Sequence, residues 1–304
     1  MGSAAVPRRR EPARRGHAII TGGSSGIGLA LAEQLALADW DLTLIARHSG
    51  RLAAARERVA AHGVAVRTYP ADVADEEAVA AAVHATSADL GPPRLAVACA
   101  GIVVPGPIAA LPMDAFRRSI EVNYLGSLNF VRAVLPLLPR HAGARIVLVA
   151  SGAALVGLYG LAAYAPSKFA LRGLGEALRS DLLPEGIAVS VVYPPDTDTP
   201  GYREELRHRS AITSILAGSG GLMTADQVAQ AILRGMARDR FAIAPGARMA
   251  ALARLHSLIA PWLNRFWFDR VIRRESRRPG THIDRDAAST HHGVIESNGP
   301  RGDA

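Results

Sequence analysis

The chain contains a single lysine, Lys168, four residues after Tyr164, although Lys and Arg together number 35. Lysine carries a compact ammonium on a flexible stem, whereas arginine carries a planar, permanently charged guanidinium. Residues four apart share a helix face, so the Lys168 ammonium would lie near the Tyr164 phenol and is expected to lower its pKa. The pair predicts a general acid or base for interconverting a carbonyl and an alcohol. The alternative is a solvated Tyr and Lys at helical spacing.

A glycine-rich segment, Thr-Gly-Gly-Ser-Ser-Gly-Ile-Gly, occupies positions 21–28. Its glycines allow a tight turn and a close approach to a pyrophosphate, whose charge the N-terminus of the following helix would stabilise. An apolar run precedes the segment and a helical pattern follows it, as in dinucleotide-binding loops. The residues expected to contact the cofactor here are Gly22, Ser24, Ser25, Gly26, Ile27 and Gly28.

The residues after the second predicted strand indicate which dinucleotide binds. An acidic residue there would hold the ribose hydroxyls of NAD, but Arg47 and Arg51 stand in this region and suit the 2′-phosphate of NADP. We therefore expect NADPH/NADP+ as the cofactor, the alternative being two solvated arginines. Asp72 and Val73 follow the third predicted strand, where they would lie near the adenine.

Short apolar runs alternate with helical patterns through the central part of the chain. Strands that are almost wholly apolar and separated by helices indicate a parallel sheet covered on both faces. The sequence therefore predicts an α/β fold, a doubly wound parallel sheet (Rossmann fold) of about seven strands with helices on both faces and a C-terminal helical extension. We expect strands at 17–21, 42–46, 64–69, 95–98, 145–150, 188–193 and 241–244, and helices at 27–38, 51–61, 76–88, 113–138 and 164–183.

Taken together, these motifs resemble the classical short-chain dehydrogenase/reductase family over residues 16–244. The resemblance rests on the 21–28 loop, on Tyr164 with Lys168, and on two further positions. Ser151 stands thirteen residues before Tyr164, where the family has its catalytic serine, and Asn123 lies in Val-Asn-Tyr-Leu-Gly, which is similar to the family's helix asparagine motif.

The resemblance implies a role for each of these residues. Tyr164 would donate a proton, and Ser151 would hydrogen-bond to the developing alkoxide. Lys168 would lower the tyrosine pKa and hold the nicotinamide ribose, and Asn123 would orient a water that relays protons. Gly101, Tyr164 and Lys168 would contact the cofactor. One departure is Ala98, where the family usually has an asparagine that braces the central sheet.

A second segment, Tyr193–Gly201, reads Tyr-Pro-Pro-Asp-Thr-Asp-Thr-Pro-Gly and resembles a signature of 3-ketodihydrosphingosine (3-dehydrosphinganine) reductases. This resemblance implies that Thr197 and Thr199 meet the nicotinamide end of the cofactor. It also implies a long-chain amino-ketone lipid as substrate, with NADPH-dependent reduction of its 3-keto group to sphinganine. The alternatives are another 3-oxoacyl or hydrophobic ketone substrate and, more remotely, a non-catalytic dinucleotide-binding sensor.

Composition limits where the protein acts and what it binds. The single cysteine, Cys99, excludes an intramolecular disulfide and a cysteine-built zinc site, and no metal site is expected. No apolar run has a membrane-spanning length, and the basic N-terminus lacks the apolar region of a secretory signal. The net charge of +8 lies mainly in the flanks of a neutral body, which argues against a nucleic-acid groove. We expect a cytoplasmic homo-oligomer.

The sequence divides into a central domain and three flanking segments. We expect a basic disordered tail at 1–16, an NADP-binding reductase domain at 17–245, an amphipathic extension at 246–278 and a disordered tail at 279–304. The extension combines Trp262, Phe266 and Trp267 with arginines, which is typical of a segment lying in a membrane interface. Its apolar face could instead cap the substrate cleft, pack on the domain or form an oligomer interface.

Overall fold

The structure is a computed structural model that describes residues 16–276. The two predicted disordered tails lie outside the described residues, except that Gly16 already belongs to the first strand. A seven-stranded sheet, all of whose pairings are parallel, forms the centre in the order β3-β2-β1-β4-β5-β6-β9. Its strands are β1 (Gly16–Thr21), β2 (Trp40–Ala46), β3 (Val66–Pro70), β4 (Leu95–Ala98), β5 (Arg145–Val149), β6 (Ala188–Val192) and β9 (Ala242–Ile243).

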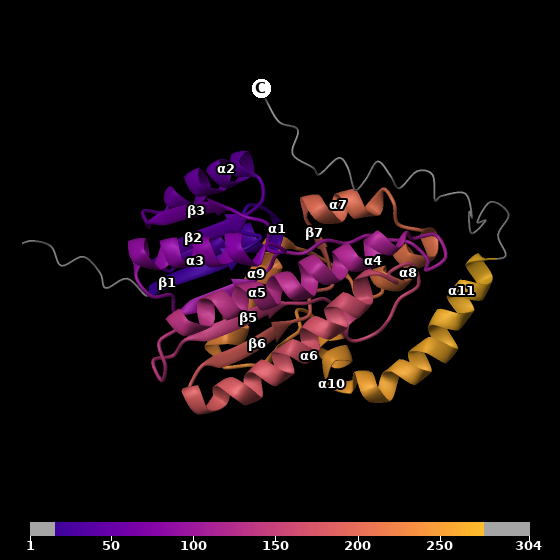
Figure 1. Cartoon of the computed structure of the whole chain (residues 1–304). Coiled ribbons are helices and arrows are strands. Elements are labelled where there is room, and N and C mark those ends of the chain that lie inside the picture. Colours follow the sequence, from indigo (N-terminus) through magenta and orange to yellow (C-terminus); the bar gives the residue numbers. More distant parts are fainter. Residues whose placement is uncertain (1–15, 277–304) are drawn as a thin grey trace, which may run out of the picture.

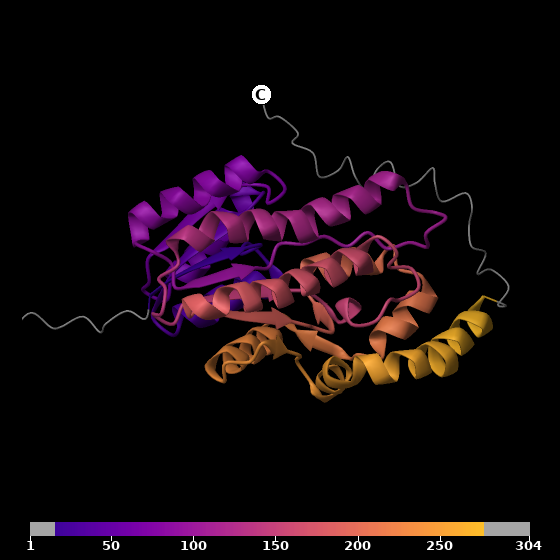
Figure 2. The same cartoon turned by 60° about the horizontal axis from the view of Figure 1, so that its bottom comes forward.

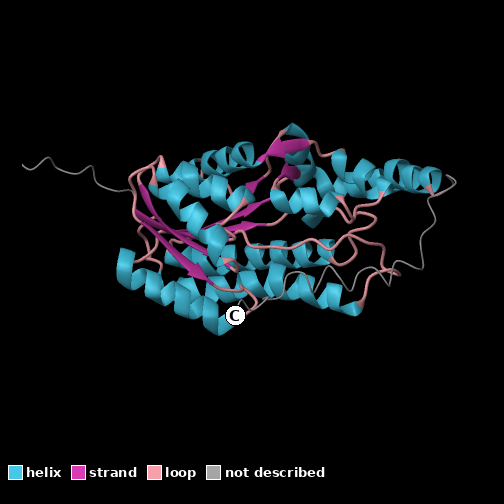
Figure 3. Ribbon diagram, turned by 90° about the horizontal axis from the view of Figure 1, so that it is seen from above, coloured by secondary structure: helices cyan, strands magenta, loops and turns pink. Residues whose placement is uncertain are grey.

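Helices cover both faces of this sheet, as the apolar strands predict, and Figure 3 shows the strands between two helical layers. Successive side chains of a strand point to opposite faces, so Ile19 packs with one core cluster and its neighbours Ala18 and Ile20 with the other. The Ile19 face is covered by α3 (Glu76–Leu90), α5 (Gly126–Val134) and α6 (Tyr164–Leu182), and the other face by α1 (Gly26–Ala36), α2 (Ser49–Ala60) and α9 (Ala225–Ala237).

The strand order reverses beside β1, whose neighbours are β2 and β4. In doubly wound sheets, ligands bind outside the carboxyl ends of the strands at such a reversal. Here the segments after β1, β4, β5 and β6, which contain Gly22, Gly101, Ser151 and Thr197, begin at this edge.

The helix predicted at 113–138 is interrupted in the structure. It consists of α4 (Met113–Ile120), a π-helical turn η1 (Glu121–Leu125), α5, and a 3-10 turn η2 (Leu135–Leu137). π-helical turns inside α-helices frequently occur at functional sites, and this one contains Asn123.

The region after β6 contains more regular structure than we expect from the sequence. A small parallel sheet pairs β7 (Asp196–Asp198) with β8 (Leu222–Thr224), and between them lie α7 (Pro200–Leu206) and α8 (Ala211–Gly218). Helix α9 follows directly, and it begins with a capping box in which Thr224 and Gln227 satisfy each other's backbone N–H groups.

The C-terminal extension is helical, as predicted. It consists of α10 (Ala247–Trp262), a π-helical turn η5 (Leu263–Phe268) and α11 (Asp269–Glu275), drawn in yellow along one side of the molecule in Figure 2. Met249 and Phe268 are buried against the main core, and α11 contacts α8. One side of the extension therefore packs on the domain, which is one of the three expected alternatives to a membrane contact.

Candidate active site

Ser151 and Tyr164 meet at the carboxyl edge of the sheet. Ser151 follows β5 and begins a 3-10 turn, η3 (Gly152–Ala154), where its Oγ accepts a hydrogen bond of 3.1 Å from Ala153 N. Tyr164 is the first residue of α6, and its hydroxyl hydrogen-bonds with Ser151. The structure thus brings together the two residues that the family resemblance assigns to proton donation and alkoxide binding.

The pKa of Tyr164 is raised, so the prediction of a lowered pKa is wrong for this structure. Burial of the hydroxyl is the main cause, and the Ser151 hydrogen bond offsets it only in part. The carboxylates of Glu205 and Asp196 raise this pKa further, because they disfavour a second negative charge nearby. Tyr164 is therefore a protonated phenol at neutral pH.

Lys168 lies beside the ring of Tyr164 and is anchored to the end of β5. Its Nζ lies 5.7 Å from the centre of the Tyr164 ring and donates a hydrogen bond of 3.1 Å to Val149 O at the end of β5. The side chain is buried, and burial lowers its pKa to about 8. Helical spacing brings the two residues onto one face, but it does not determine where the ammonium points.

Gly101 lies against both Lys168 and Asn123. A Cβ atom at this position would stand 3.1 Å from Asn123 Oδ1 and 3.3 Å from Lys168 Nζ. A side chain there would therefore crowd the polar atoms on either side, which explains the glycine physically.

Asn123 is fully buried and its side chain connects two segments of the site. Its Oδ1 accepts a hydrogen bond of 2.8 Å from Ile102 N, and its Nδ2 donates to Ile102 O at 3.0 Å and to Ser167 Oγ at 2.9 Å. Its backbone oxygen accepts a bond of 2.8 Å from Ser127 Oγ. Both amide hydrogens of the side chain are thus used in fixing the loop after β4 to helix α6.

The glycine-rich loop has the geometry of an anion-binding turn. Gly22 and Gly26 have φ values of +70° and +56°, which favour glycine. A Cβ atom on Gly28 would lie 2.4 Å from Gly22 O, so the first turn of α1 packs directly on the loop. Ser25 is the N-cap of α1 and its side chain makes no capping hydrogen bond. The first N–H groups of the helix are therefore not capped by that side chain.

The two arginines expected to select NADP lie at the mouth of this loop, after β2 and at the start of α2. The side chains of Arg47 and Arg51 are exposed and form no hydrogen bond or ion pair with another residue in the range 16–276, although the charge of Arg47 helps to lower the pKa of Asp72. The pKa of His48, which lies between them in the sequence, is lowered by burial and by the charges of both arginines. A positive potential therefore exists at this end of the sheet.

Asp72 and Val73 follow β3, and each already has a close neighbour. Asp72 pairs with Arg118 at 2.6 Å, while a Cβ atom on Gly126 would lie 2.6 Å from Val73 Cγ2. Burial raises the pKa of Asp72, but the Ala74 N–H and Arg118 outweigh it and hold the pKa below its usual value. Asp72 is therefore a charged residue whose carboxylate is partly occupied by protein donors.

The segment after β6 brings Thr199 to the glycine-rich loop. A Cβ atom on Gly26 would stand 3.0 Å from Thr199 Cγ2, and Thr199 Oγ1 accepts a hydrogen bond of 3.1 Å from Tyr202 N as the N-cap of α7. Thr197 Oγ1 donates to Pro195 O at 2.9 Å and is mostly buried. Both threonines thus shape the segment that closes over the carboxyl edge.

Thr21 supplies a brace where Ala98 replaces the family asparagine. Its Oγ1 accepts hydrogen bonds from Cys99 N at 3.1 Å and Ala100 N at 3.3 Å, so β1 is tied to the loop after β4. Ala98 itself is buried in the core. This contact holds the loop without the asparagine side chain.

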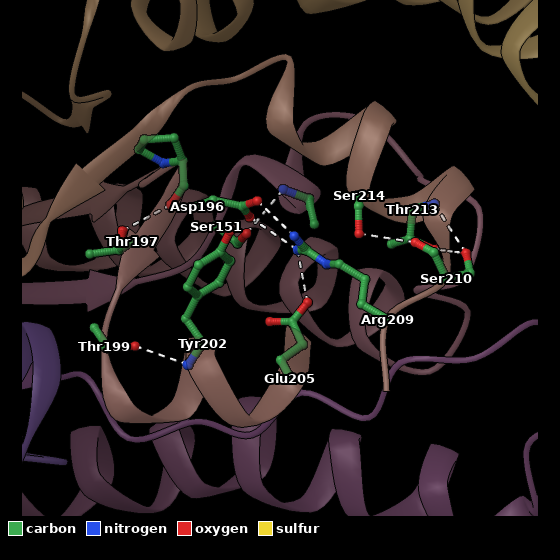
Figure 4. A network of polar contacts seen from close by, with 12 residues as sticks. Ser151, Asp196, Thr197, Thr199, Tyr202, Glu205, Arg209, Ser210, Thr213 and Ser214 are labelled. Atoms are coloured by element: carbon green, nitrogen blue, oxygen red, sulfur yellow. Dashed lines mark hydrogen bonds and ion pairs between the residues drawn. The ribbon is translucent and has the colours of Figure 1, made fainter. Parts of the chain in front are cut away.

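A buried polar network beside Ser151 was not expected from the sequence (Figure 4). Arg209 binds Asp196 with Nη1 at 2.7 Å and Nη2 at 3.0 Å, and forms an ion pair with Glu205 at 2.8 Å. The guanidinium also lies 5.5 Å from the centre of the Tyr202 ring. The spacing of Glu205 and Arg209 by four residues was the only available signal, and it is common on solvated helices.

Within residues 16–276 there is no group of three or more His, Cys, Asp or Glu side chains arranged to hold a metal ion. None of the helices described there is both long and apolar enough to cross a membrane.

Comparisons with known proteins agree with this arrangement. Residues 16–210 match the family model described as short chain dehydrogenase. A 3-dehydrosphinganine reductase from Danio rerio is 37% identical over 230 residues, which cover 74% of this chain and 69% of that protein. A 3-ketodihydrosphingosine reductase from Bos taurus is 34% identical over 250 residues, which cover 81% of this chain and 75% of that protein.

Two solved structures share the fold. A short chain dehydrogenase from Burkholderia cenocepacia J2315 in complex with NADP has a TM-score of 0.64 and 31% identity, covering 73% of this chain and 91% of that one. A short chain dehydrogenase/reductase from Burkholderia phymatum in complex with NAD has a TM-score of 0.72 and 26% identity, covering 82% of this chain and 95% of that one. These matches confirm the resemblance seen in the motifs, and the chain belongs to the short chain dehydrogenase family.

Proposed function

We propose that this protein reduces the 3-keto group of 3-dehydrosphinganine to sphinganine with NADPH, a step of sphingolipid biosynthesis. The observation that carries the proposal is the similarity to reductases of that name over about three quarters of the chain. The Ser151, Tyr164 and Lys168 set at the carboxyl edge of the sheet supports an oxidoreductase acting on a carbonyl or hydroxyl group.

The residues of the carboxyl edge fit a nicotinamide dinucleotide. The close packing of the glycines leaves backbone, not side chains, at the turn before α1, and a helix N-terminus there favours a pyrophosphate. Exposed Arg47 and Arg51 would bind the 2′-phosphate, and this supports NADPH over NADH. Ser24 and Ile27 of the loop, Asp72, Val73 and Gly101 would border the adenine and ribose, and Thr197 and Thr199 the nicotinamide end. When bound, NADPH supplies the hydride.

Tyr164 is the proton donor in this proposal. A donor must be protonated before the reaction, and the raised pKa of Tyr164 meets that condition. Ser151, already hydrogen-bonded to the phenol, would share the carbonyl oxygen with it and stabilise the negative charge that develops there.

Lys168 would hold the ribose hydroxyls and return a proton toward Tyr164. Its pKa of about 8 allows the ammonium to gain and lose a proton near neutral pH. The hydrogen bond to Val149 O fixes the stem while leaving other ammonium hydrogens for the cofactor. Asn123 would keep the loop after β4 and helix α6 in register, so its contribution would be to position Lys168.

The C-terminal extension would contact a membrane surface, where a long-chain lipid substrate partitions. Trp262 is 66% exposed and stacks on Phe266 with ring centres 5.0 Å apart, and Trp267 is 46% exposed. Arg265 and Arg270 are exposed on the same segment, and Arg270 lies 6.0 Å from the Phe266 ring centre. Aromatic and basic residues together favour an anionic interface. In this proposal the protein is cytoplasmic and peripheral to the membrane. The homo-oligomer and the domain boundary at 245/246 stay predictions.

A purified-protein assay tests the proposed function. Wild-type protein and Tyr164→Phe are incubated with NADPH and 3-dehydrosphinganine in mixed micelles, and sphinganine is measured by mass spectrometry. We expect the wild type to form one molecule of sphinganine for each NADPH consumed. The variant should form no sphinganine above background. Absence of sphinganine with the wild type, while another hydrophobic ketone is reduced, would favour the broader ketoreductase alternative. Loss of all turnover with retained NADPH binding would favour the sensor.

A further inference from the structure

The network beside Ser151 contains one more negative than positive charge. Asp196, Glu205 and Arg209 have side chains that are 14%, 9% and 3% exposed. The phenol of Tyr202 donates a further hydrogen bond to Asp196. Two carboxylates thus share one guanidinium in a region largely removed from water. A buried unpaired charge is costly unless a partner of opposite sign compensates it.

Glu205 is the carboxylate that remains under-compensated. Arg209 uses both terminal nitrogens in its bidentate contact with Asp196. Although Arg209 Nη2 also lies 2.8 Å from Glu205 Oε1, this buried oxygen accepts no aligned hydrogen bond from the residues described. Burial raises the pKa of Glu205 despite the opposing effect of Arg209. This oxygen therefore lacks a well-aligned donor, and a positive charge beside it would relieve the net negative charge of the network.

The network lies next to the reacting groups. The charges of Glu205 and Asp196 act directly on the hydroxyl of Tyr164, which hydrogen-bonds with Ser151. Figure 4 draws Ser151 in the same close-up as Tyr202 and Asp196, with Glu205 on helix α7 and Arg209 after it. A ligand whose oxygen contacts both Ser151 and Tyr164 would therefore lie within the electrostatic reach of these carboxylates.

We propose that Glu205, held in place by Asp196 and Arg209, binds a primary ammonium group on the carbon next to the reacting carbonyl. This inference deepens the proposed function and rests on it, because the 3-keto lipid carries its amino group on that neighbouring carbon. An ammonium has three donors and suits a carboxylate oxygen that lacks one. The site would then select amino ketones over ketones and thioesters of equal chain length.

A purely structural role fits Glu205 less well than Asp196. The bidentate Asp196–Arg209 pair already ties the start of β7 to the start of α8, because Arg209 directly precedes Ser210, the N-cap of that helix. Glu205 adds a buried charge to this pair without an aligned hydrogen bond, which raises rather than lowers the cost of folding. Its neighbour Glu204 instead pairs with Arg207 on the surface at 2.8 Å. Glu204 is therefore a matched control of the same residue type on the same helix.

Binding of simple amphiphiles tests the ammonium site without turnover. Octylamine and octanol are titrated calorimetrically into wild type, Glu205→Gln and Glu204→Gln, each saturated with NADP+. We expect wild type and Glu204→Gln to bind the amine about 10- to 100-fold more tightly than the alcohol, as for a charge-assisted hydrogen bond. Glu205→Gln should bind the two about equally. Equal binding by wild type, or a preference that persists in Glu205→Gln, overturns the inference.

Kinetics then separate this inference from the proposed function. The ratio of kcat/KM for 3-dehydrosphinganine to that for the same ketone without the amino group is compared among the three proteins. We expect Glu205→Gln to reduce the ratio about tenfold or more through KM, and Glu204→Gln to keep it. Failure of wild type to reduce the amino ketone contradicts the function, whereas reduction with an unchanged ratio contradicts only the role of Glu205. If Glu205→Gln lowers the Tm so far that the variant cannot be assayed, the calorimetric preference of the wild type for octylamine over octanol tests the inference instead.

Discussion

The ammonium of Lys168 donates a hydrogen bond of 3.1 Å to the backbone oxygen of Val149, which joins helix α6 to the end of strand β5. The same ammonium, which belongs to the only lysine of the chain, lies 5.7 Å from the centre of the Tyr164 ring. Because both groups are poorly solvated, the neutral phenol and a proton-exchanging lysine coexist a few ångströms apart. A protonated phenol can donate a proton to a carbonyl, and a lysine that exchanges protons near neutral pH can help to restore it.

Replacing Tyr164 by Phe should lower kcat by about 100- to 10,000-fold or more, because only the proton donor is removed. The Kd for NADPH, measured by fluorescence titration, should stay within about threefold of wild type, since other residues bind the dinucleotide. Near-normal turnover by this variant would contradict the role of Tyr164.

Replacing Lys168 by Arg should strongly impair reduction although the charge is kept. The lysine side chain is only 4% exposed and its ammonium makes a single directed contact, so a larger planar guanidinium does not fit the space. The measurement is kcat together with the Kd for NADPH. Full activity in the arginine variant would show that the identity of this cation is unimportant.

The buried Lys168 should also give a characteristic pH dependence of stability. Its pKa is about 8 in the folded protein and about 10.4 in an unfolded chain, so between these values the unfolded state binds more protons. Stability should therefore rise with pH in this window, by about 3 kcal/mol in total, relative to Lys168→Met. Urea unfolding at several pH values from 7 to about 10 measures this difference. A difference that does not change with pH would contradict the buried ammonium.

Replacing Arg47 and Arg51 by Ala should weaken binding of NADPH far more than that of NADH. Only NADPH carries the 2′-phosphate, and two charge-assisted contacts could shift the preference by about 100-fold or more. The exposed Arg56 on the same helix gives a control, since Arg56→Ala should leave the preference unchanged. Equal losses for both dinucleotides in the double variant would exclude a phosphate site here.

Asn123→Ala should destabilise the protein by about 2–5 kcal/mol, because it removes the side-chain partners of both Ile102 backbone groups and one of the two hydrogen bonds of Ser167 Oγ. Asn129 offers a comparison, since it makes one side-chain bond, of 3.1 Å to Val73 O, and Asn129→Ala should cost about 1 kcal/mol. Chemical denaturation measures both. Similar small costs would show that the Asn123 network is not a major brace.

Replacing Trp262 and Trp267 by Ala should release the protein from vesicles that contain phosphatidylglycerol. Both side chains are exposed, whereas Met249 and Phe268 are buried, so substitution tests the interface without removing parts of the core. Added salt should also weaken binding, because it screens the arginines over about 8–10 Å. Ile108 and Leu183 are exposed elsewhere, and their double Ala variant is the control. Unchanged co-sedimentation of the tryptophan variant would exclude this membrane contact.

Most of the seven strands could be predicted because they are short apolar runs between helical patterns, although β3 (Val66–Pro70) is largely polar and only partly buried. The interruption at Glu121–Leu125 could not, because a π-helical turn leaves the apolar spacing nearly unchanged. Helix α9 was missed although Thr224 and Gln227 have capping-box spacing before an apolar helical pattern.

The motifs could predict which candidate residues gather at the carboxyl edge of the sheet, but they could not predict the electrostatics of those residues. The hydrogen bond of the Lys168 ammonium to Val149 O depends on where β5 ends, and that strand lies 19 residues away in the sequence. Likewise, Glu205 and Arg209 look like an ordinary solvated pair until tertiary packing buries them beside Asp196. Burial of charges is a property of the fold, so a single sequence carries little sign of it.

The substrate preference of the purified enzyme tests the central claim most directly. The measurement is kcat/KM with NADPH for 3-dehydrosphinganine and for a 3-oxoacyl thioester of the same chain length, in the same micelles. The account predicts that 3-dehydrosphinganine is reduced to sphinganine with a kcat/KM at least about tenfold higher, since the ammonium would add a charge-assisted contact. A higher kcat/KM for the thioester, or no reduction of 3-dehydrosphinganine at all, would contradict it.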